Sequence, residues 1–443
     1  MLQRTSPEDQ HNRLLFALDE EHGLLNDIDE SSSRQSSRPA SPAHQNHHSP
    51  RLWIRQLGRW VNIVTYALVL FFSIRVVKDY EQPGDVRFRG PIEYAVAHPK
   101  PSGYAKQEKI FIAAMFSNNH EVLPYWSDTL IKTIHYLGTN NVFVSVVESH
   151  SDDNSPDLLR ALDRKLAHIG VARRILTEDE SINKPEDMGG NNRIDFLAAI
   201  RNRALEPLME NGGYDKVIFS NDIFIEPETI VELLETAEGE YDMACGLDFA
   251  HFGAYDAWVL RDRQGKLASS VWPYFFDEAD YQAMHTESPV PVFTCWNGII
   301  VVRADPLLPI ALRSNGTLST DPLSTPLPTT HPAAHIPPTS PALTPPLRFR
   351  ASAPGECFSS ESFLLPYDLR RQFNMQRIYV NPRVITAYQW RFYLYFKWFM
   401  RHPVLKWWIE KMYDGAWMQR AVMVVGDASH IFWWDGGDCH PWW

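Results

Sequence analysis

The 443-residue sequence contains few cysteines and none of the short motifs that mark the commonest enzyme classes. Its four cysteines form no C-x-x-C pair, which argues against a structural zinc site and a fold built on disulfides, although one or two disulfides remain compatible with it. H-E-x-x-H, G-x-S-x-G, Walker A and G-x-G-x-x-G motifs are all missing. Zinc proteases, common serine hydrolases, nucleotide kinases and dinucleotide enzymes are therefore disfavoured.

Positive charge is also in short supply. The chain has 42 Lys and Arg against 54 Asp and Glu, a formal charge of −12. Nucleic-acid binding depends on clustered basic residues, so we expect no nucleic-acid partner. The composition, 44% hydrophobic and 12% aromatic, is that of a globular protein. Its length allows two or three domains, or one large domain with extensions.

The N-terminal region lacks a globular pattern. Residues 1–52 are rich in Ser and Pro and are predicted to be a disordered cytosolic tail. An apolar run uncharged from Trp60 until Arg75 follows three arginines, which predicts an uncleaved signal anchor over residues 53–78. A buried globular helix is the alternative for this run. Residues 79–107 are expected to be a polar luminal stem.

Residues 108–443 alternate between strand and helix patterns and are predicted to form an α/β domain with a mainly parallel sheet. Ligands of such sheets bind at the carboxyl ends of the strands. The expected strands are 109–116, 141–148 and 214–220, and the expected helices are 121–137, 156–170 and 193–209.

A proline-rich stretch interrupts this domain. Residues 314–347 have no apolar period and are expected to lie outside the fold, as a disordered insertion, an O-glycosylated stalk or a translated intron. Asn315 begins an Asn-Gly-Thr glycosylation sequon. From Trp390 to about Met423 the chain is aromatic and basic, which favours a packing helix or a membrane-surface helix over a second span.

Acidic residues follow two predicted strands. The strand at 216–219 leads into Asn221 and Asp222, which places a carboxylate where a divalent ion bridging a diphosphate would bind. An ordinary Asn-Asp turn is the alternative. Glu148 ends the second strand and is a candidate for contacting a nucleoside, with a simple helix cap as the alternative.

Three further segments carry candidate binding residues. Arginines on the helix around residues 193–203 offer fork-shaped donors for phosphate, although a solvated basic face would look the same. A tryptophan followed by Asn-Gly precedes an apolar strand, so the ring could stack on a sugar and the glycine would admit backbone close to a ligand. Glu361 opens a helix and either caps it or faces an acceptor hydroxyl. The candidate donor-binding residues are Glu148, Arg193, Arg201, Asn202, Trp296, Asn297 and Gly298.

The order of these pieces resembles the glycosyltransferase A-type fold, a Rossmann-like domain of nucleotide-sugar transferases. The amino-acid sequence of these segments resembles that of the fungal capsule-associated α-1,3-mannosyltransferases, glycosyltransferase family 69, over residues 105–310 and 348–435. The matching segments are Ile110-Phe-Ile-Ala-Ala-Met-Phe-Ser-Asn-Asn, Ile194-Asp-Phe-Leu-Ala-Ala-Ile-Arg-Asn, Phe219-Ser-Asn-Asp-Ile-Phe, Ala244-Cys-Gly-Leu-Asp-Phe, Cys295-Trp-Asn-Gly and Tyr379-Val-Asn-Pro-Arg-Val.

This resemblance implies a single-pass type II membrane protein of the Golgi or another secretory membrane, with a luminal catalytic domain. It also implies transfer of mannose from GDP-mannose to the 3-hydroxyl of a mannose-containing glycan, with retention of configuration and with Mn²⁺, or alternatively Mg²⁺. Asp222 matches the family's metal-binding acid, and Glu361 matches its glutamate after the glycine loop. Asp248 and Asp256 are expected to orient donor or acceptor hydroxyls.

The sequence departs from the family pattern in two places. The usual D-x-D motif is reduced to Asn221-Asp222-Ile223, and residues 381–388 lack the histidine that often completes the metal shell. A transferase using another sugar nucleotide, or a non-catalytic protein that assists polysaccharide assembly or export, are the alternatives.

Overall fold

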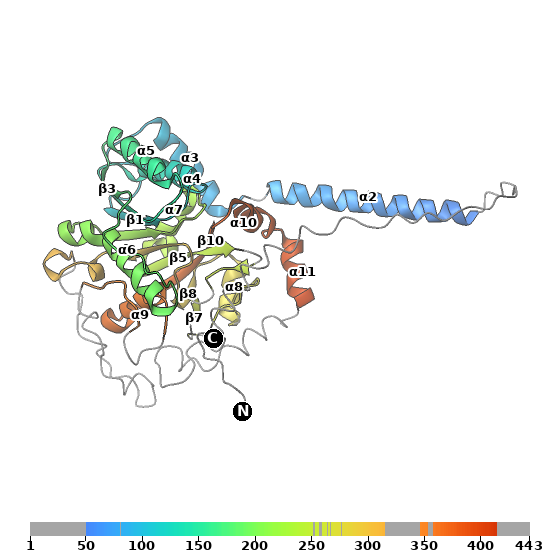
Figure 1. Cartoon of the computed structure of the whole chain (residues 1–443). Helices are drawn as coiled ribbons and strands as arrows, with labels where there is room; N and C mark the ends of the chain where they lie inside the picture. Colours follow the sequence, from blue (N-terminus) through green and yellow to red (C-terminus); the bar gives the residue numbers. More distant parts are fainter. Residues whose placement is uncertain are drawn as a thin grey trace, which may run out of the picture. The chain divides into compact units, whose positions relative to one another are not determined.

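A computed structural model of the chain describes residues 50–79, 81–250, 253–256, 259–263, 265, 267–275, 277–314, 346–352 and 358–413 (Figure 1). The chain divides into two units between Asp79 and Tyr80, and each is described by itself. Nearly all of the predicted tail, the sequon at Asn315 and almost all of the proline-rich insertion lie outside the described residues.

The first unit contains one described helix, α2, which covers Pro50–Asp79. Its apolar side chains between Trp60 and Ile74 are exposed. None of the described helices combines the length and the apolar character that a membrane span requires. The signal anchor therefore stays a prediction.

The second unit is built on one mixed sheet, in which the strand order is β3-β2-β1-β4-β9-β5-β10-β8-β7 and β6 pairs with β5. Strands β1 to β4 are mutually parallel, as the sequence predicted, and β5 and β10 run in the same direction. The antiparallel strand β9 separates the two parallel groups. The strand bounds are β1 Ile110–Phe116, β2 Val142–Glu148, β3 Ala172–Leu176, β4 Lys216–Ser220, β5 Met243–Ala250, β6 Gly253–Ala254, β7 Arg261–Asp262, β8 Val290–Thr294, β9 Ile299–Arg303 and β10 Ile378–Ala387.

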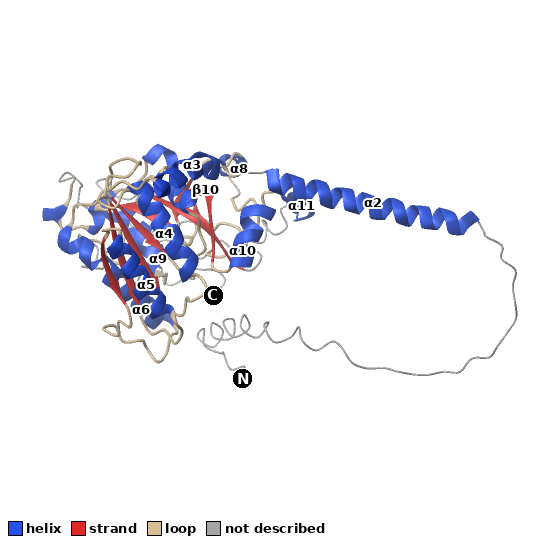
Figure 2. Cartoon of the chain, turned by 90° about the horizontal axis from the view of Figure 1, so that it is seen from above, coloured by secondary structure: helices blue, strands red, loops and turns tan. Residues whose placement is uncertain are grey.

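Helices cover both faces of this sheet (Figure 2). On one face, α3, α4 and α7 contact one another, α5 contacts α4 and β3, and α10 packs on β10. On the other face, α6 lies on β1 and β2 and contacts α9. The helix bounds are α3 Pro83–Ala97, α4 Leu123–Leu137, α5 Ser155–His168, α6 Gly190–Asn211, α7 Pro227–Leu234, α8 Glu278–His285, α9 Glu361–Phe373, α10 Trp390–Leu394 and α11 Pro403–Tyr413, with a π-helix, Tyr395–Phe399, after α10.

The segment expected to be a polar stem contributes a helix to the folded unit. Phe88 and Ile92 of α3 are buried against Val231 of α7, and Asp85 lies 3.2 Å from the Lys397 ammonium. The apolar residues of α3 recur four apart among charged ones, so they form one narrow stripe that packs on α4 and α7. The folded part of the chain therefore begins before residue 108.

The two ends of the proline-rich insertion meet at one short helix, Asp305–Leu307. Ser314 donates from its backbone N–H and its hydroxyl to the Asp305 carboxylate, each at 2.9 Å. Leu347 donates from its backbone N–H to the Pro306 carbonyl at 2.9 Å. The chain thus leaves and re-enters the fold at neighbouring points.

A disulfide joins Cys245 of β5 to Cys295, which immediately precedes the loop leading into β9. Both cysteines are fully buried. The disulfide ties Trp296, Asn297 and Gly298 to the central strands of the sheet.

Candidate functional site

Polar residues gather where β1, β4, β5 and β10 end at one edge of the sheet. Because these four strands run in the same direction, their carboxyl ends share that edge. The residues that meet there are Asn119 after β1, Asn221 and Asp222 after β4, Asp248 in β5 and Tyr388 after β10. The predicted strand-end site is therefore a real cluster of side chains in the described residues.

Asp222 lies at the end of β4 and is held by a residue from another strand. The Asn119 side chain donates to Asp222 Oδ2 at 2.7 Å. Burial raises the pKa of Asp222 to about 6, while the Asn119 hydrogen bond and the positive charge of Arg201 oppose the rise. Protonation of this carboxylate is thus shifted from the acid range towards neutral pH.

Arg201 of α6 is buried and is surrounded by partners. Its Nε donates to Glu361 Oε1 at 3.1 Å, and its Nη1 lies 3.4 Å from Asn221 Oδ1. Its guanidinium carbon lies 4.4 Å from the centre of the Trp296 ring. Arg201 therefore joins α6, α9 and the end of β4, and its side chain is not free to wrap around a phosphate.

Asn221 is the point at which this network meets the rest of the site. Its Oδ1 also accepts a hydrogen bond from Trp296 Nε1 at 3.1 Å, and its Nδ2 donates to the Tyr388 hydroxyl at 3.0 Å. Its backbone N–H donates to the Gly298 carbonyl at 2.8 Å. An ionised aspartate in place of Asn221 could not donate a hydrogen bond to the Tyr388 hydroxyl. The asparagine in the reduced D-x-D motif therefore connects the end of β4 to the end of β10.

Asp248 is fully buried on β5, beneath the loop that carries Trp296 to Gly298. It accepts hydrogen bonds from Asn297 Nδ2 at 3.0 Å, from the Tyr388 hydroxyl at 3.3 Å and from the Asp256 backbone N–H at 3.3 Å. Burial raises the pKa of Asp248. Burial and the charge of Asp248 raise the pKa of Asp256 further, because two close carboxylates disfavour double ionisation.

Gly298 allows the loop and the strands to approach each other closely. Its φ is +81°, and a Cβ atom there would lie 2.5 Å from the Thr386 hydroxyl and 3.1 Å from the Asp248 Cβ. A side chain would push Asp248 or the loop away. This glycine therefore allows close packing within the site, and the approach to a ligand expected from the sequence stays a prediction.

Some predicted donor-binding residues already have partners within the protein. Glu148 is fully buried and accepts backbone N–H groups of Ser151 and Glu178. Asn202 exchanges two hydrogen bonds with the Phe349 backbone, at 2.8 and 2.9 Å. Trp296 is 1% exposed and packs against Arg201, which leaves its ring without a free face for a sugar. Arg193, in contrast, is exposed at the start of α6.

Three site residues were not anticipated from the sequence, namely Asn119, Tyr388 and Tyr255. Asn119 follows the apolar run of β1 and was quoted only as part of a motif. Tyr388 follows β10, in the place where the family's histidine was sought. Asn119 comes three residues after the expected strand 109–116, the kind of position that also pointed to Asp222. No expected strand ends directly before Tyr388 or Tyr255.

The site offers one carboxylate of the expected kind to a metal. Among the described residues no three His, Cys, Asp or Glu side chains come together to hold an ion. The carboxylate of Asp248 is already engaged by Asn297 and Tyr388. A hard divalent ion can still be held by one carboxylate together with substrate phosphates and water, so Asp222 fits a metal that arrives with a diphosphate.

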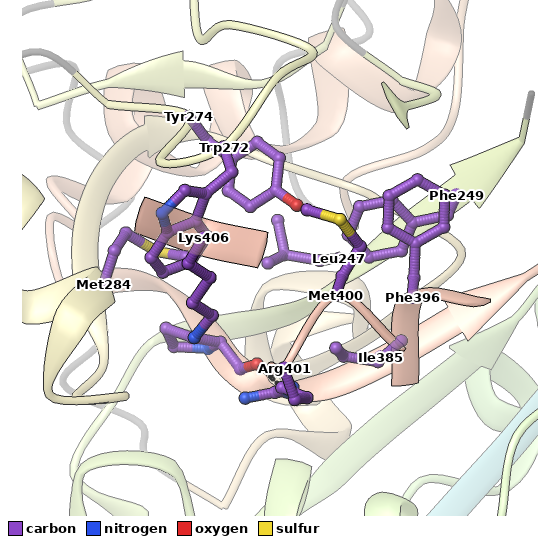
Figure 3. A pocket seen from close by; sticks show the side chains of 11 residues that line it. Leu247, Phe249, Trp272, Tyr274, Met284, Ile385, Phe396, Met400, Arg401 and Lys406 are labelled. Atoms are coloured by element: carbon purple, nitrogen blue, oxygen red, sulfur yellow. Dashed lines mark hydrogen bonds between the residues drawn. The ribbon is translucent and has the colours of Figure 1, made fainter. Parts of the chain in front are cut away.

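A small cavity is lined by Leu247 and Phe249 of β5, Ile385 of β10 and residues of the C-terminal helices such as Phe396 and Lys406 (Figure 3). Its volume of about 20 Å³ leaves room for little more than one water. Lys406 lies over the Trp272 ring at 4.1 Å, and burial lowers the pKa of this lysine to about 8. The cavity is too small for a nucleotide sugar, so it is not the donor site.

The match to known families decides the classification of the chain. The family described as Cryptococcal mannosyltransferase 1 matches residues 109–368. The chain belongs to this family. The match covers β1 to β9 and reaches into α9, and so includes Asp222, Arg201, Asp248 and Glu361. The family expected from the sequence motifs is thereby confirmed.

A curated relative of this mannosyltransferase family shares part of the sequence. The alpha-1,3-mannosyltransferase CMT1 of Cryptococcus neoformans var. neoformans serotype D is 26% identical over 208 residues. These residues make up 42% of this chain and 45% of the relative. The chain therefore matches less than half the length of that relative.

Solved structures overlap the chain weakly. The mannosyltransferase PcManGT from Pyrobaculum calidifontis, in complex with GDP-Man and Mn²⁺, gives a TM-score of 0.22 at 15% identity and covers 37% of this chain and 45% of its own. GalNAc-T7 with UDP, GalNAc and Mn²⁺ gives 0.33 at 11% identity, over 63% and 43%. TarS 1–349 of S. aureus gives 0.31 at 12% identity, over 63% and 60%. At such TM-scores these overlaps carry no argument about this chain.

Proposed function

We propose that the protein is a retaining mannosyltransferase that moves mannose from GDP-mannose to the 3-hydroxyl of a mannose-containing glycan, with an A-type glycosyltransferase domain. Its membership of the mannosyltransferase family gives the reaction class. The observation that carries the proposal is the position of Asp222, ionisable and backed by Arg201, at the carboxyl edge of the parallel strands. Nucleotides bind α/β sheets at that edge.

Asp222 would hold a divalent ion, Mn²⁺ or Mg²⁺, together with the donor diphosphate. Such an ion neutralises the charge that builds up on a departing diphosphate. Arg193 is exposed at the start of α6 and is the arginine that would reach the phosphates. Arg201 acts behind the site, where its contacts with Glu361 and Asn221 fix the loop after β4.

The two coupled aspartates would handle the sugar hydroxyls. Because the pKa of Asp256 is raised, its carboxyl group can stay protonated near neutral pH and donate a hydrogen bond. The ionisation of Asp248 and that of Asp256 influence each other. Hydrogen bonds from Asn297 and Tyr388 hold the Asp248 carboxylate in place. In the transfer, the bond from mannose C1 to the diphosphate breaks, the acceptor oxygen bonds to C1 from the same face, and its proton passes to a phosphate oxygen.

Glu361 has a different part in this scheme from the one expected from the sequence. Its carboxylate is 4% exposed and ion-paired with Arg201, so in the described conformation it positions the arginine rather than facing an acceptor. A role next to the developing charge on the sugar remains a prediction for a substrate-bound state.

We also propose that the catalytic domain works in the lumen of the Golgi or another secretory compartment, behind a single-pass type II anchor. The buried Cys245–Cys295 disulfide supports this, since disulfides form and persist in oxidising compartments. The apolar run beginning at Trp60 and the preceding arginines support the anchor and its orientation.

A donor screen with linkage analysis tests the proposed reaction. The full-length protein in detergent is mixed with GDP-mannose, UDP-glucuronic acid or UDP-xylose, a mannobiose acceptor and Mn²⁺. We expect product only with GDP-mannose, carrying a new α-1,3 linkage. Transfer from another donor would identify a different transferase, and no transfer from any donor would favour a non-catalytic role in polysaccharide assembly or export.

A further inference from the structure

Tyr255 is an exposed aromatic side chain at the edge of the candidate site. The residue is 54% exposed, whereas Trp296 in the same region is 1% exposed. Its backbone N–H donates to the carbonyl of the buried Asp248 at 3.0 Å, which fixes the residue beside the site. Its ring packs edge-on against Tyr388, with the ring centres 5.0 Å apart. The contact with Tyr388 therefore holds the ring in place, while more than half of the residue's surface stays accessible.

The groups around Tyr255 belong to the site. Partial burial raises the pKa of the Tyr255 phenol, Asp256 adds to the rise and Arg193 opposes it, with smaller effects of Asp248 and Asp222. A ring that is fixed in place, uncharged at neutral pH and close to the carboxyl groups of Asp256, Asp248 and Asp222 is suited to packing on a sugar face. Pyranose rings present an apolar C–H face that packs on an aromatic ring.

Tyr255 lies at a part of the sheet that differs from the part where the donor nucleotide is expected. A nucleotide is expected over the parallel strands β3-β2-β1-β4, with its diphosphate at Asp222 after β4. Tyr255 follows β6, which pairs with β5, and β5 lies two strands beyond β4. The ring is thus on the side of Asp222 away from the nucleoside, where the second sugar must enter.

We propose that the Tyr255 ring is the stacking platform for the pyranose ring of the acceptor sugar. This inference rests on the proposed function, since it assigns a subsite of the same reaction. It gives to Tyr255 the sugar-stacking role that the sequence alone suggested for Trp296, whose ring is occupied by Arg201.

Acceptor and donor kinetics of the full-length protein in detergent test the platform. We would measure KM for mannobiose and for GDP-mannose in wild type, Tyr255→Ala, Tyr255→Phe and Tyr94→Ala. Tyr94 of α3 is a matched control, since it is 55% exposed and lies on a helix that packs on α4 and α7. We expect Tyr255→Ala to raise the mannobiose KM about tenfold, equivalent to 1.4 kcal/mol, with the GDP-mannose KM unchanged.

Tyr255→Phe should keep the wild-type acceptor KM, because it preserves the ring and removes only the hydroxyl. This rescue also shows that the loss in Tyr255→Ala is not general misfolding. An unchanged acceptor KM in Tyr255→Ala, a rise confined to the GDP-mannose KM, or a Phe variant as weak as Ala would overturn the inference while leaving the proposed function in place. A wild-type protein that transfers no mannose would overturn the proposed function and this inference with it.

Discussion

Arg201 has the largest number of partners among the side chains of the site. Its buried ion pair with Glu361 and its contact with Asn221 require the planar fork of a guanidinium, which a lysine cannot reproduce. Removing one member of a buried ion pair leaves the other charge unpaired and destabilises the fold. A substitution that keeps the positive charge of residue 201 therefore tests its role more cleanly.

We predict that Arg201→Lys lowers kcat for mannosyl transfer about tenfold to a hundredfold, because Asn221 and the loop after β4 lose their fixed position. Arg203→Lys is the matched control on the same helix, since Arg203 is partly exposed and bonds Asp179 and Glu206. Initial rates and thermal melts of both variants provide the measurement. Equal rates for the two variants would remove Arg201 from the account.

The raised pKa of the Asp256 carboxyl group should make the stability of the fold depend on pH. A carboxyl group whose pKa is raised in the folded state stabilises the fold while it is protonated, and this contribution is lost as the pH rises through the raised value. The relevant window runs upward from the ordinary aspartate pKa of 3.8. Asp256 is only half-buried, so the effect is screened.

We predict that the free energy of unfolding falls less in Asp256→Asn than in wild type when the pH is raised from 5 to 8.5. The difference between the two falls should be about 1 kcal/mol. The asparagine preserves size and cannot ionise. Denaturant unfolding at the two pH values measures the difference, with Asp128→Asn as an exposed control on α4. Parallel losses in wild type and Asp256→Asn would show that this carboxyl group is not perturbed by the fold.

Several individual residues of the site could be predicted from the sequence, and others could not. Asp222 was found because it follows an apolar strand, and strand ends of parallel sheets converge. The pairing of Arg201 with Glu361 joins residues 160 apart, and no local pattern contains that information. Trp296 was misjudged because a sequence gives residue type without burial.

At the scale of elements, α3 is the clearest difference between expectation and structure. Its sequence mixes apolar and charged residues and contains proline at two positions, so it looked like a connector. Its few apolar residues nevertheless pack on α7, and Asp85 reaches the buried Lys397. Short amphipathic helices depend on tertiary contacts, which a sequence shows poorly. The strands expected at 109–116, 141–148 and 214–220 are continuous apolar runs, and the structure has strands at Ile110–Phe116, Val142–Glu148 and Lys216–Ser220.

We predict that α3 is needed for stability. A protein beginning at Tyr80 should fold, whereas one beginning at Lys100 should have a lower melting temperature or aggregate, because it exposes the apolar residues of α7 and leaves Lys397 without Asp85. Thermal melts and gel filtration of the two proteins distinguish these outcomes. Equal melting temperatures would mean that α3 contributes nothing to the fold.

At the scale of the whole molecule, we propose a luminal transferase domain behind an N-terminal anchor. The anchor depends on the apolar run of α2, although no described helix meets the requirements of a membrane span. Sheet order was also beyond prediction, since the antiparallel β9 enters between β4 and β5 through contacts that are distant in sequence. The expectation of parallel strands at the start of the domain was correct.

We predict that full-length protein stays with membranes after carbonate extraction, while the protein beginning at Tyr80 is released. An apolar run embedded in the hydrocarbon core resists alkaline extraction, and peripheral contacts do not. Immunoblots of pellet and supernatant provide the measurement. Full-length protein in the supernatant would contradict the anchor.

The most direct test of the central claim is the rate of mannose transfer from GDP-mannose by Asp222→Asn. This change preserves size and most hydrogen bonding and removes the charge that would hold the ion. We expect a loss of about a hundredfold or more, equivalent to about 2.7 kcal/mol of barrier, with the melting temperature nearly unchanged.

Asp128→Asn again provides the control, and chelator should abolish wild-type transfer until Mn²⁺ is restored. Turnover at the wild-type rate in Asp222→Asn, together with wild-type activity in chelator, would contradict a metal-assisted mannosyltransferase centred on Asp222.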